Sequence, residues 1–174
     1  MNALASLNQP LLATNGLDMN VSRLDFKRLK HKYTESSEAE MSAAEWDMTE
    51  QEYCRFLTLK RFYPSVALVP SKTVDAIWHA HILNTRAYRE DCQQVFGRFI
   101  DHYPYFGIYG QDDYQELKSA FAQTVALYEK HFGAYPGGGS EAQAMRCKDH
   151  ACHVPTTCAC RVEGLDVDHH HVDA

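Results

Sequence analysis

Two groups of residues in this sequence carry side chains that commonly bind metal ions. The first group is the pair His79 and His81, in the run VDAIWHAHILNTRAYREDCQQVFGR that begins at Val74. The second is the segment CKDHACHVPTTCAC, which contributes the candidate ligands Cys147, His150, Cys152, His153, Cys158 and Cys160. Imidazole and thiolate are ligands of tetrahedral zinc, and thiolate also suits softer ions such as Cu(I). The C-terminal segment therefore predicts a zinc or copper site.

The spacing within this C-terminal segment leaves other interpretations open. It contains no CxxC knuckle, and its second half is a CxC, so it does not follow a zinc-finger or zinc-ribbon pattern. The alternatives are a disordered tail with incidental thiols, or disulfides formed on oxidation, for which four cysteines allow three pairings. Further imidazoles and carboxylates lie near the end of the chain. They either add metal ligands or only make this end of the chain polar and solvent-exposed: Asp166, Asp168, His169, His170, His171 and Asp173.

The two histidines of the central run point in different directions on a helix. Successive helical residues lie about 100° apart, so residues two positions apart face nearly opposite sides. This places His81 on the apolar face and His79 outward with Asp75, and one ion cannot be chelated by both. His81 is then either a buried, hydrogen-bonded imidazole or a ligand, and His102 is a candidate partner for either histidine. Asp75 and His79 are expected to form a solvated helix pair.

Cys92 is predicted to be a thiol of the hydrophobic core rather than a ligand. On one continuous helix it lies three turns from His81, roughly 16 Å along the axis, which is too far to share an ion. The sequence has no glycine-rich phosphate loop, no HExxH and no GxSxG, so it carries none of these catalytic signatures. Whether the protein is an enzyme therefore stays open.

Four helices are predicted to position these residues. A capping-box spacing at Ser22 begins a helix that ends near Tyr33, and a second such box at Thr49 begins one that ends before Pro64. The longest helix is predicted to run from Ser71 to about Phe96. An irregular aromatic loop follows over residues 101–110, and a last helix is capped by Asp113 and ends at Gly133. The sequence predicts an all-α fold, a compact bundle of about four helices.

Composition and charge narrow the function classes. The 174 residues suffice for one domain, with 45% hydrophobic residues and a formal net charge of -6. This charge disfavours nucleic acid as a partner, and no membrane-spanning stretch or signal peptide is recognised, so we expect a cytoplasmic protein. Residues 1–20 are expected to form a loosely ordered arm, residues 21–135 the helical domain, and residues 136–174 a glycine linker with a flexible Cys/His-rich C-terminal tail.

The central run resembles a known family. Its residues resemble the WHxHxLNxxxYxxDCxxxxG signature of the glycine-rich domain-containing protein-like family at these positions: Trp78, His79, His81, Leu83, Asn84, Tyr88, Asp91, Cys92, Phe96 and Gly97. Plant relatives carry this region near the start of much longer chains, and this chain looks like a short bacterial-type member. The resemblance implies a family without implying a reaction.

The favoured hypothesis from sequence is a small metal-binding or metal-handling protein, in which a helical domain docks an unknown protein partner while the tail holds zinc or copper. One alternative is a non-catalytic interaction scaffold with a structural WHxH helix and a disordered tail. Another is a metal-dependent enzyme that uses His79 or His81 with His102. The oligomeric state is not predicted.

Overall fold

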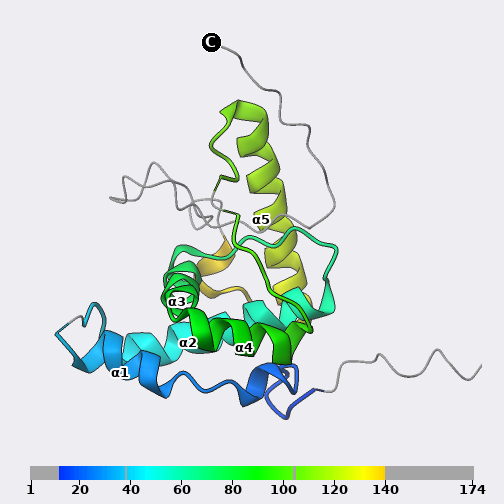
Figure 1. Ribbon diagram of the computed structural model, residues 1–174. Coiled ribbons are helices and arrows are strands. Elements are labelled where there is room, and N and C mark those ends of the chain that lie inside the picture. The colour runs from blue at the N-terminus through cyan, green and yellow to red at the C-terminus, as the bar shows by residue number, and fades with distance from the viewer. Residues whose placement is uncertain (1–11, 38, 104, 140–174) are drawn as a thin grey trace, which may run out of the picture.

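The protein is all-α, as predicted. The computed structural model describes residues 12–37, 39–103 and 105–139, and within these ranges the only β pairing is an isolated bridge between Leu12 and Asp18. Five α-helices and two short 3-10 helices follow one another along the chain (Figure 1): η1 Val21–Arg23, α1 Lys27–Glu35, α2 Ala43–Phe62, α3 Lys72–Leu83, α4 Thr85–Phe96, α5 Gly110–Phe132 and η2 Pro136–Gly139.

Helix α2 is the centre of the packing, since α1, α3 and α5 all contact it. Its side chains Trp46, Tyr53 and Leu59 are completely buried. The helix begins at a capping box, in which the Ser42 hydroxyl accepts a hydrogen bond from the backbone N–H of Glu45 and the Glu45 carboxylate accepts one from the backbone N–H of Ser42. The predicted start near Thr49 was wrong, because this earlier box lies in a segment whose polar composition suggested a loop.

The predicted single helix over residues 71–96 is two helices that meet at Asn84. Asn84 has φ −82° and ψ 62°, so it ends α3 and starts α4 at a change of direction. In a continuous helix, residues ten positions apart are about 15 Å apart along the axis. Across this break, Trp78 Nε1 donates to the hydroxyl of Tyr88 at 3.0 Å, and His81 Nε2 lies 2.9 Å from Asp91 Oδ2. The break therefore folds the central run into a helical hairpin.

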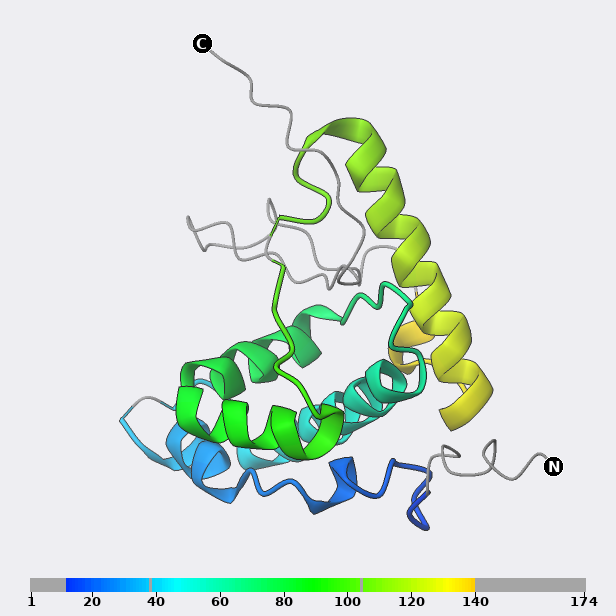
Figure 2. The same cartoon turned by 45° about the vertical axis from the view of Figure 1, so that its right-hand side comes forward.

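The aromatic loop after α4 was predicted, and it is anchored to α5 at Gly107. Gly107 has φ +84°, and a Cβ on it would lie 2.5 Å from Leu117 Cδ2, so only glycine fits. The Asp113 carboxylate accepts hydrogen bonds from the backbone N–H groups of Gly107 at 2.7 Å and Tyr109 at 3.0 Å. Figure 2 shows this loop running from α4 to an end of α5 that stands away from the other helices.

Residues that precede Val21 already pack against the helices. Leu17 and Asp18 are buried, and Asp18 Oδ2 lies 2.9 Å from Nε of Arg61 on α2. These two residues fall within the predicted N-terminal arm, whose first eleven residues lie outside the described part of the chain. No helix of the described chain is long and apolar enough to cross a membrane.

Candidate metal site and its surroundings

Asp75, His79 and His102 form a cluster in which three potential metal-ligand atoms lie within 4.8 Å of one another. The two imidazoles face each other with their Nε2 atoms 3.2 Å apart. Nε2 of His102 also lies 3.4 Å from Asp75 Oδ1, and Nδ1 of His79 lies 3.6 Å from Asp75 Oδ2. The side chain of Asp75 is 2% exposed, that of His102 11% and that of His79 31%, so the cluster opens to solvent on the His79 side.

Local structure explains how α3 presents two members of this cluster. Ser71 caps the helix by accepting a hydrogen bond from the backbone N–H of Val74 at 3.4 Å. Asp75 follows in the first turn, where the helix dipole favours a carboxylate. His79 lies one turn further on the same side, at the i, i+4 spacing. The carboxylate and the first imidazole are therefore neighbours by helix geometry alone.

The third member, His102, comes from the aromatic loop and is held by contacts with α3 and α4. Its ring packs edge-on against Trp78, with ring centroids 4.9 Å apart. Two residues earlier, the backbone carbonyl of Ile100 accepts a hydrogen bond of 2.7 Å from the hydroxyl of Tyr88. That hydroxyl also receives the Trp78 indole N–H, so one buried phenol joins the loop to both helices.

His81 belongs to a separate network on the other side of α3. It is 3% exposed, with Nδ1 2.9 Å from the hydroxyl of Tyr53 and Nε2 2.9 Å from Asp91 Oδ2. The prediction of a buried, hydrogen-bonded His81 is confirmed. Of the two predicted pairings with His102, the structure forms the one with His79 and not the one with His81.

Two other sequence-based expectations about this region were wrong. Asp75 and His79 are not a solvated pair, because Asp75 is 1% exposed in the folded chain. The distance of roughly 16 Å between His81 and Cys92 assumed one continuous helix. Since the chain turns at Asn84, both side chains border the same small internal cavity. Cys92 is nevertheless a core thiol, 2% exposed, and burial raises its pKa.

The predicted ligands of the C-terminal tail lie outside the described residues: Cys147, His150, Cys152, His153, Cys158 and Cys160. They stay a prediction from sequence.

The spacing of the cluster atoms is compatible with metal coordination. Two ligands bonded to a tetrahedral zinc ion at 2.0–2.1 Å are about 3.4 Å apart. The two contacts that Nε2 of His102 makes, 3.2 Å to His79 and 3.4 Å to Asp75, are close to this value. The first lies at the upper end of the usual hydrogen-bond range of about 2.7–3.2 Å, and the second lies just beyond it. A single proton on Nε2 of His102 also cannot form a well-aligned hydrogen bond to both His79 and Asp75.

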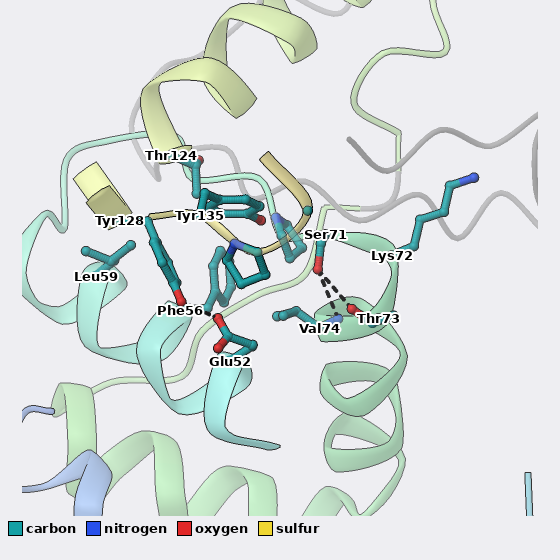
Figure 3. Close-up of a pocket in the computed structure, with 13 residues that line it drawn as sticks. Glu52, Phe56, Leu59, Ser71, Lys72, Thr73, Val74, Thr124, Tyr128 and Tyr135 are labelled. Carbon is teal, nitrogen blue, oxygen red and sulfur yellow. Dashed lines mark hydrogen bonds between the residues drawn. The ribbon is translucent and has the colours of Figure 1, made fainter. Parts of the chain in front are cut away.

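A larger pocket of about 330 Å³ lies at the start of α3 but contains none of the three cluster residues. Figure 3 shows its walls, with Phe56 and Leu59 from α2, Tyr128 from α5 beside them, Tyr135 above, and Val74 from α3 on the other side. Its lining is mostly apolar. It therefore supplies a hydrophobic cavity and no ligand set for a metal.

The polar corner of this pocket is already internally paired. The Tyr128 hydroxyl donates to Glu52 at 2.6 Å and accepts from Arg55 at 2.6 Å, and burial raises the pKa of Tyr128 to about 12. The phenol is thus neutral and hydrogen-bonded to Glu52 and Arg55, so this corner of the pocket indicates no catalytic or binding role.

Comparison with known proteins places the cluster inside a recognised family. The UCP032817-like family profile matches residues 18–127, which include every described residue of the cluster and of the His81 network. The chain belongs to the UCP032817-like family. Glycine-rich domain-containing protein 1 of Arabidopsis thaliana is 33% identical over 76 residues, covering 44% of this chain and 8% of the plant protein. No solved structure matches the chain.

The plant match supports the resemblance to glycine-rich domain-containing proteins, while the short bacterial type stays a prediction. This chain spans less than a tenth of the plant relative's length, so the name of that protein carries no activity over to this chain.

The role of Asp75 was the main feature that sequence reasoning missed. Its i, i+4 spacing to His79 was a usable signal, but its burial depends on the loop that brings His102 across α3. The sequence of the helix alone gives no indication that the loop covers Asp75.

Proposed function

We propose that the helical domain binds a divalent transition-metal ion through Asp75, His79 and His102, and that the protein functions in metal binding or handling. The observation that carries the proposal is the pair of contacts at Nε2 of His102, whose lengths match ligand-to-ligand separations around a tetrahedral ion. Three protein ligands leave one position for water or another ligand.

The burial of Asp75 supports the same proposal. A carboxylate taken out of water needs compensation from charge or hydrogen bonds, and a cation beside it supplies both charge and coordination. The two imidazoles can compensate it through N–H groups, but a metal ion would do so while also occupying the facing nitrogens. Ion binding thus accounts for the approach of the three side chains.

The ligand types favour zinc at this cluster. Two imidazoles and one carboxylate suit borderline ions, and the same set with open positions also occurs around non-haem Fe(II). Cu(I) prefers thiolates, and the cluster contains none. Copper is therefore more compatible with the cysteines predicted in the tail, and the two regions would differ in metal preference.

The tail is proposed as a second metal-binding region, from sequence alone. Its thiols and imidazoles offer a set of soft ligands, and its first cysteine, Cys147, follows η2 by only eight residues. A protein with a borderline imidazole and carboxylate site in the domain and softer thiolate ligands in the tail could hold or pass on metal ions.

Elemental analysis of the untagged full chain, purified without chelator, tests the proposal in a two-by-two design. One arm replaces both cluster histidines, His79→Gln and His102→Gln. The other replaces Cys147, Cys152, Cys158 and Cys160 by serine, hereafter the tail-serine variant. His31→Ala is the matched control, because His31 is exposed and pairs only with Glu35 among the described residues.

The expected result is near-stoichiometric zinc in the tail-serine variant that disappears when the two cluster histidines are also replaced. Zinc titration of the same proteins should show affinity lowered at least about ten-fold by either cluster substitution. If the tail-serine variant carries no metal and binds none on titration, the domain site is refuted. Metal absent from the unmodified chain as well would favour the interaction scaffold.

A further inference from the structure

A second pocket lies on the other side of α3 from the metal cluster and shares no residue with it. Its volume is about 460 Å³, and it is formed where α1 passes the break between α3 and α4. His81 and Asp91 line it, with Asn84 from the break and Arg28 from α1. The pocket therefore collects five polar residues of the central run that the proposed metal site does not use, because Arg86 and Glu90 also line it, and Asp25 adds a further carboxylate.

The hydrogen bonds behind this pocket form one chain that begins in the core. Tyr53 is completely buried, and desolvation raises its pKa well above the ordinary value, so its phenol is neutral and carries a proton. A neutral phenol can donate to Nδ1 of His81, and Nε2–H of the imidazole can then donate to Asp91. The chain of contacts runs from Tyr53 through His81 to the Asp91 carboxylate.

This order is the reverse of the one found in hydrolytic triads. In a triad, the carboxylate is buried and the hydroxyl nucleophile faces the substrate. Here the hydroxyl is inside, both ring nitrogens of His81 are occupied, and the carboxylate is the group at the pocket. The arrangement suits a fixed anionic anchor for a ligand rather than a nucleophile.

Three polar groups of the pocket have hydrogen-bonding capacity left over. Asp91 has one contact, from its Oδ2 to His81, and its Oδ1 has none with any described residue. The exposed guanidinium of Arg28 forms no ion pair within the described chain, and neither does the side-chain amide of Asn84 form a hydrogen bond there. By contrast, Arg86 at the rim is paired with Glu90 at 3.3 Å.

We infer that this pocket binds a small zwitterion of the amino-acid class, with its ammonium group on Asp91 and its carboxylate on Arg28. The half-buried carboxylate would supply a charge-assisted hydrogen bond at the base, and the guanidinium a bidentate one at the rim. Asn84 can donate to or accept from either end. The inference is independent of the proposed metal function and goes beyond it.

Titration of the isotope-labelled full chain with L-glutamine, followed by NMR, tests the inference. We expect saturable shifts of the backbone amides of Asn84 and Ala87, with a dissociation constant weakened at least about ten-fold by Asp91→Asn and by Arg28→Gln. The matched controls are Glu129→Gln and Arg89→Gln, which remove exposed charges outside the pocket and should leave binding unchanged.

Two single-charge probes sharpen the result. Butylamine and butyrate each lack one charge of the zwitterion, and both should bind at least about ten-fold more weakly than L-glutamine. Equal affinity for butylamine, no saturable shift with L-glutamine, or shifts unaffected by both pocket substitutions would each overturn the inference. Because Arg28 is exposed, Arg28→Gln keeps the test valid even if Asp91→Asn destabilises the fold.

Discussion

The two histidines of the WHxH run sit two residues apart and occupy different kinds of environment. His81 has both ring nitrogens engaged by buried or half-buried partners and is almost completely covered. His79 lies at the solvent side of its cluster, with contacts of 3.2 Å to His102 and 3.6 Å to Asp75. Short hydrogen bonds to both ring nitrogens suit a structural role for His81, whereas the partial exposure and longer contacts of His79 are compatible with the ion proposed above. The two histidines therefore differ in burial and bonding although they share a residue type.

The largest expected effect separates the two histidines by stability. His81→Ala should lower the free energy of unfolding by about 2–4 kcal/mol, because it opens a cavity and leaves Tyr53 and Asp91 without their partner. His79→Ala in metal-free protein should cost less than about 1 kcal/mol. Urea unfolding of the full chain measures both, with His31→Ala as the exposed control. Equal losses at the two positions would contradict the comparison.

Added zinc should give the next largest effect, and only through the His79 side. At a free concentration one hundred times the dissociation constant, ligand binding adds about 2.7 kcal/mol to stability. We expect this increment in the tail-serine variant and its loss on His79→Gln or His102→Gln. The His81→Gln variant should be less stable without zinc, but zinc should still raise its free energy of unfolding by the same amount. Thermal unfolding with and without zinc provides the measurement.

Tyr88 connects the two regions, so its substitution should affect both. Tyr88→Phe leaves the Trp78 indole N–H and the Ile100 carbonyl without the hydroxyl that bonds them. The expected loss of stability is about 1–3 kcal/mol. Since Ile100 lies two residues before His102, zinc affinity should fall several-fold as well. A loss of stability with unchanged zinc affinity would show that the loop is held by other contacts.

The smallest effect concerns His131, which lies outside both regions and serves as a reference. Partial burial and then the charge of Lys130 lower its pKa below the ordinary value of 6.5. The unfolded chain therefore binds a proton at a higher pH than the folded chain. The stability associated with His131 is present above pH 6.5 and is lost as pH falls through the folded pKa. His131→Gln should flatten unfolding free energy between pH 7 and 5 slightly, while an unchanged slope would exclude this contribution.

The helical class and the orientation of His81 followed from sequence, because apolar spacing along a helix reports which face is buried. The break at Asn84 did not follow, since asparagine is tolerated within helices and no proline or glycine marks the turn. Both networks depend on that break or on the loop beyond it. Asp91 and His102 reach their partners through chain reversals that periodicity cannot encode.

The burial of Asp75 was also not predicted from the sequence. A carboxylate and an imidazole four residues apart are usually a solvated pair on a helix surface. Here Trp78 and the aromatic loop cover that surface, and the charge becomes buried. The chemistry of the cluster thus comes from tertiary cover added to an ordinary helical spacing.

The turn at Asn84 also has a consequence for the order of folding. The bonds from Trp78 to Tyr88 and from His81 to Asp91 each close a loop of only ten residues. Short loops cost little chain entropy and form quickly. The contacts from His102 back to His79 and Asp75 span 23 and 27 residues, and that from Tyr53 to His81 spans 28. We therefore expect the α3–α4 hairpin to form early in folding, and the cluster of Asp75, His79 and His102 to assemble on it later.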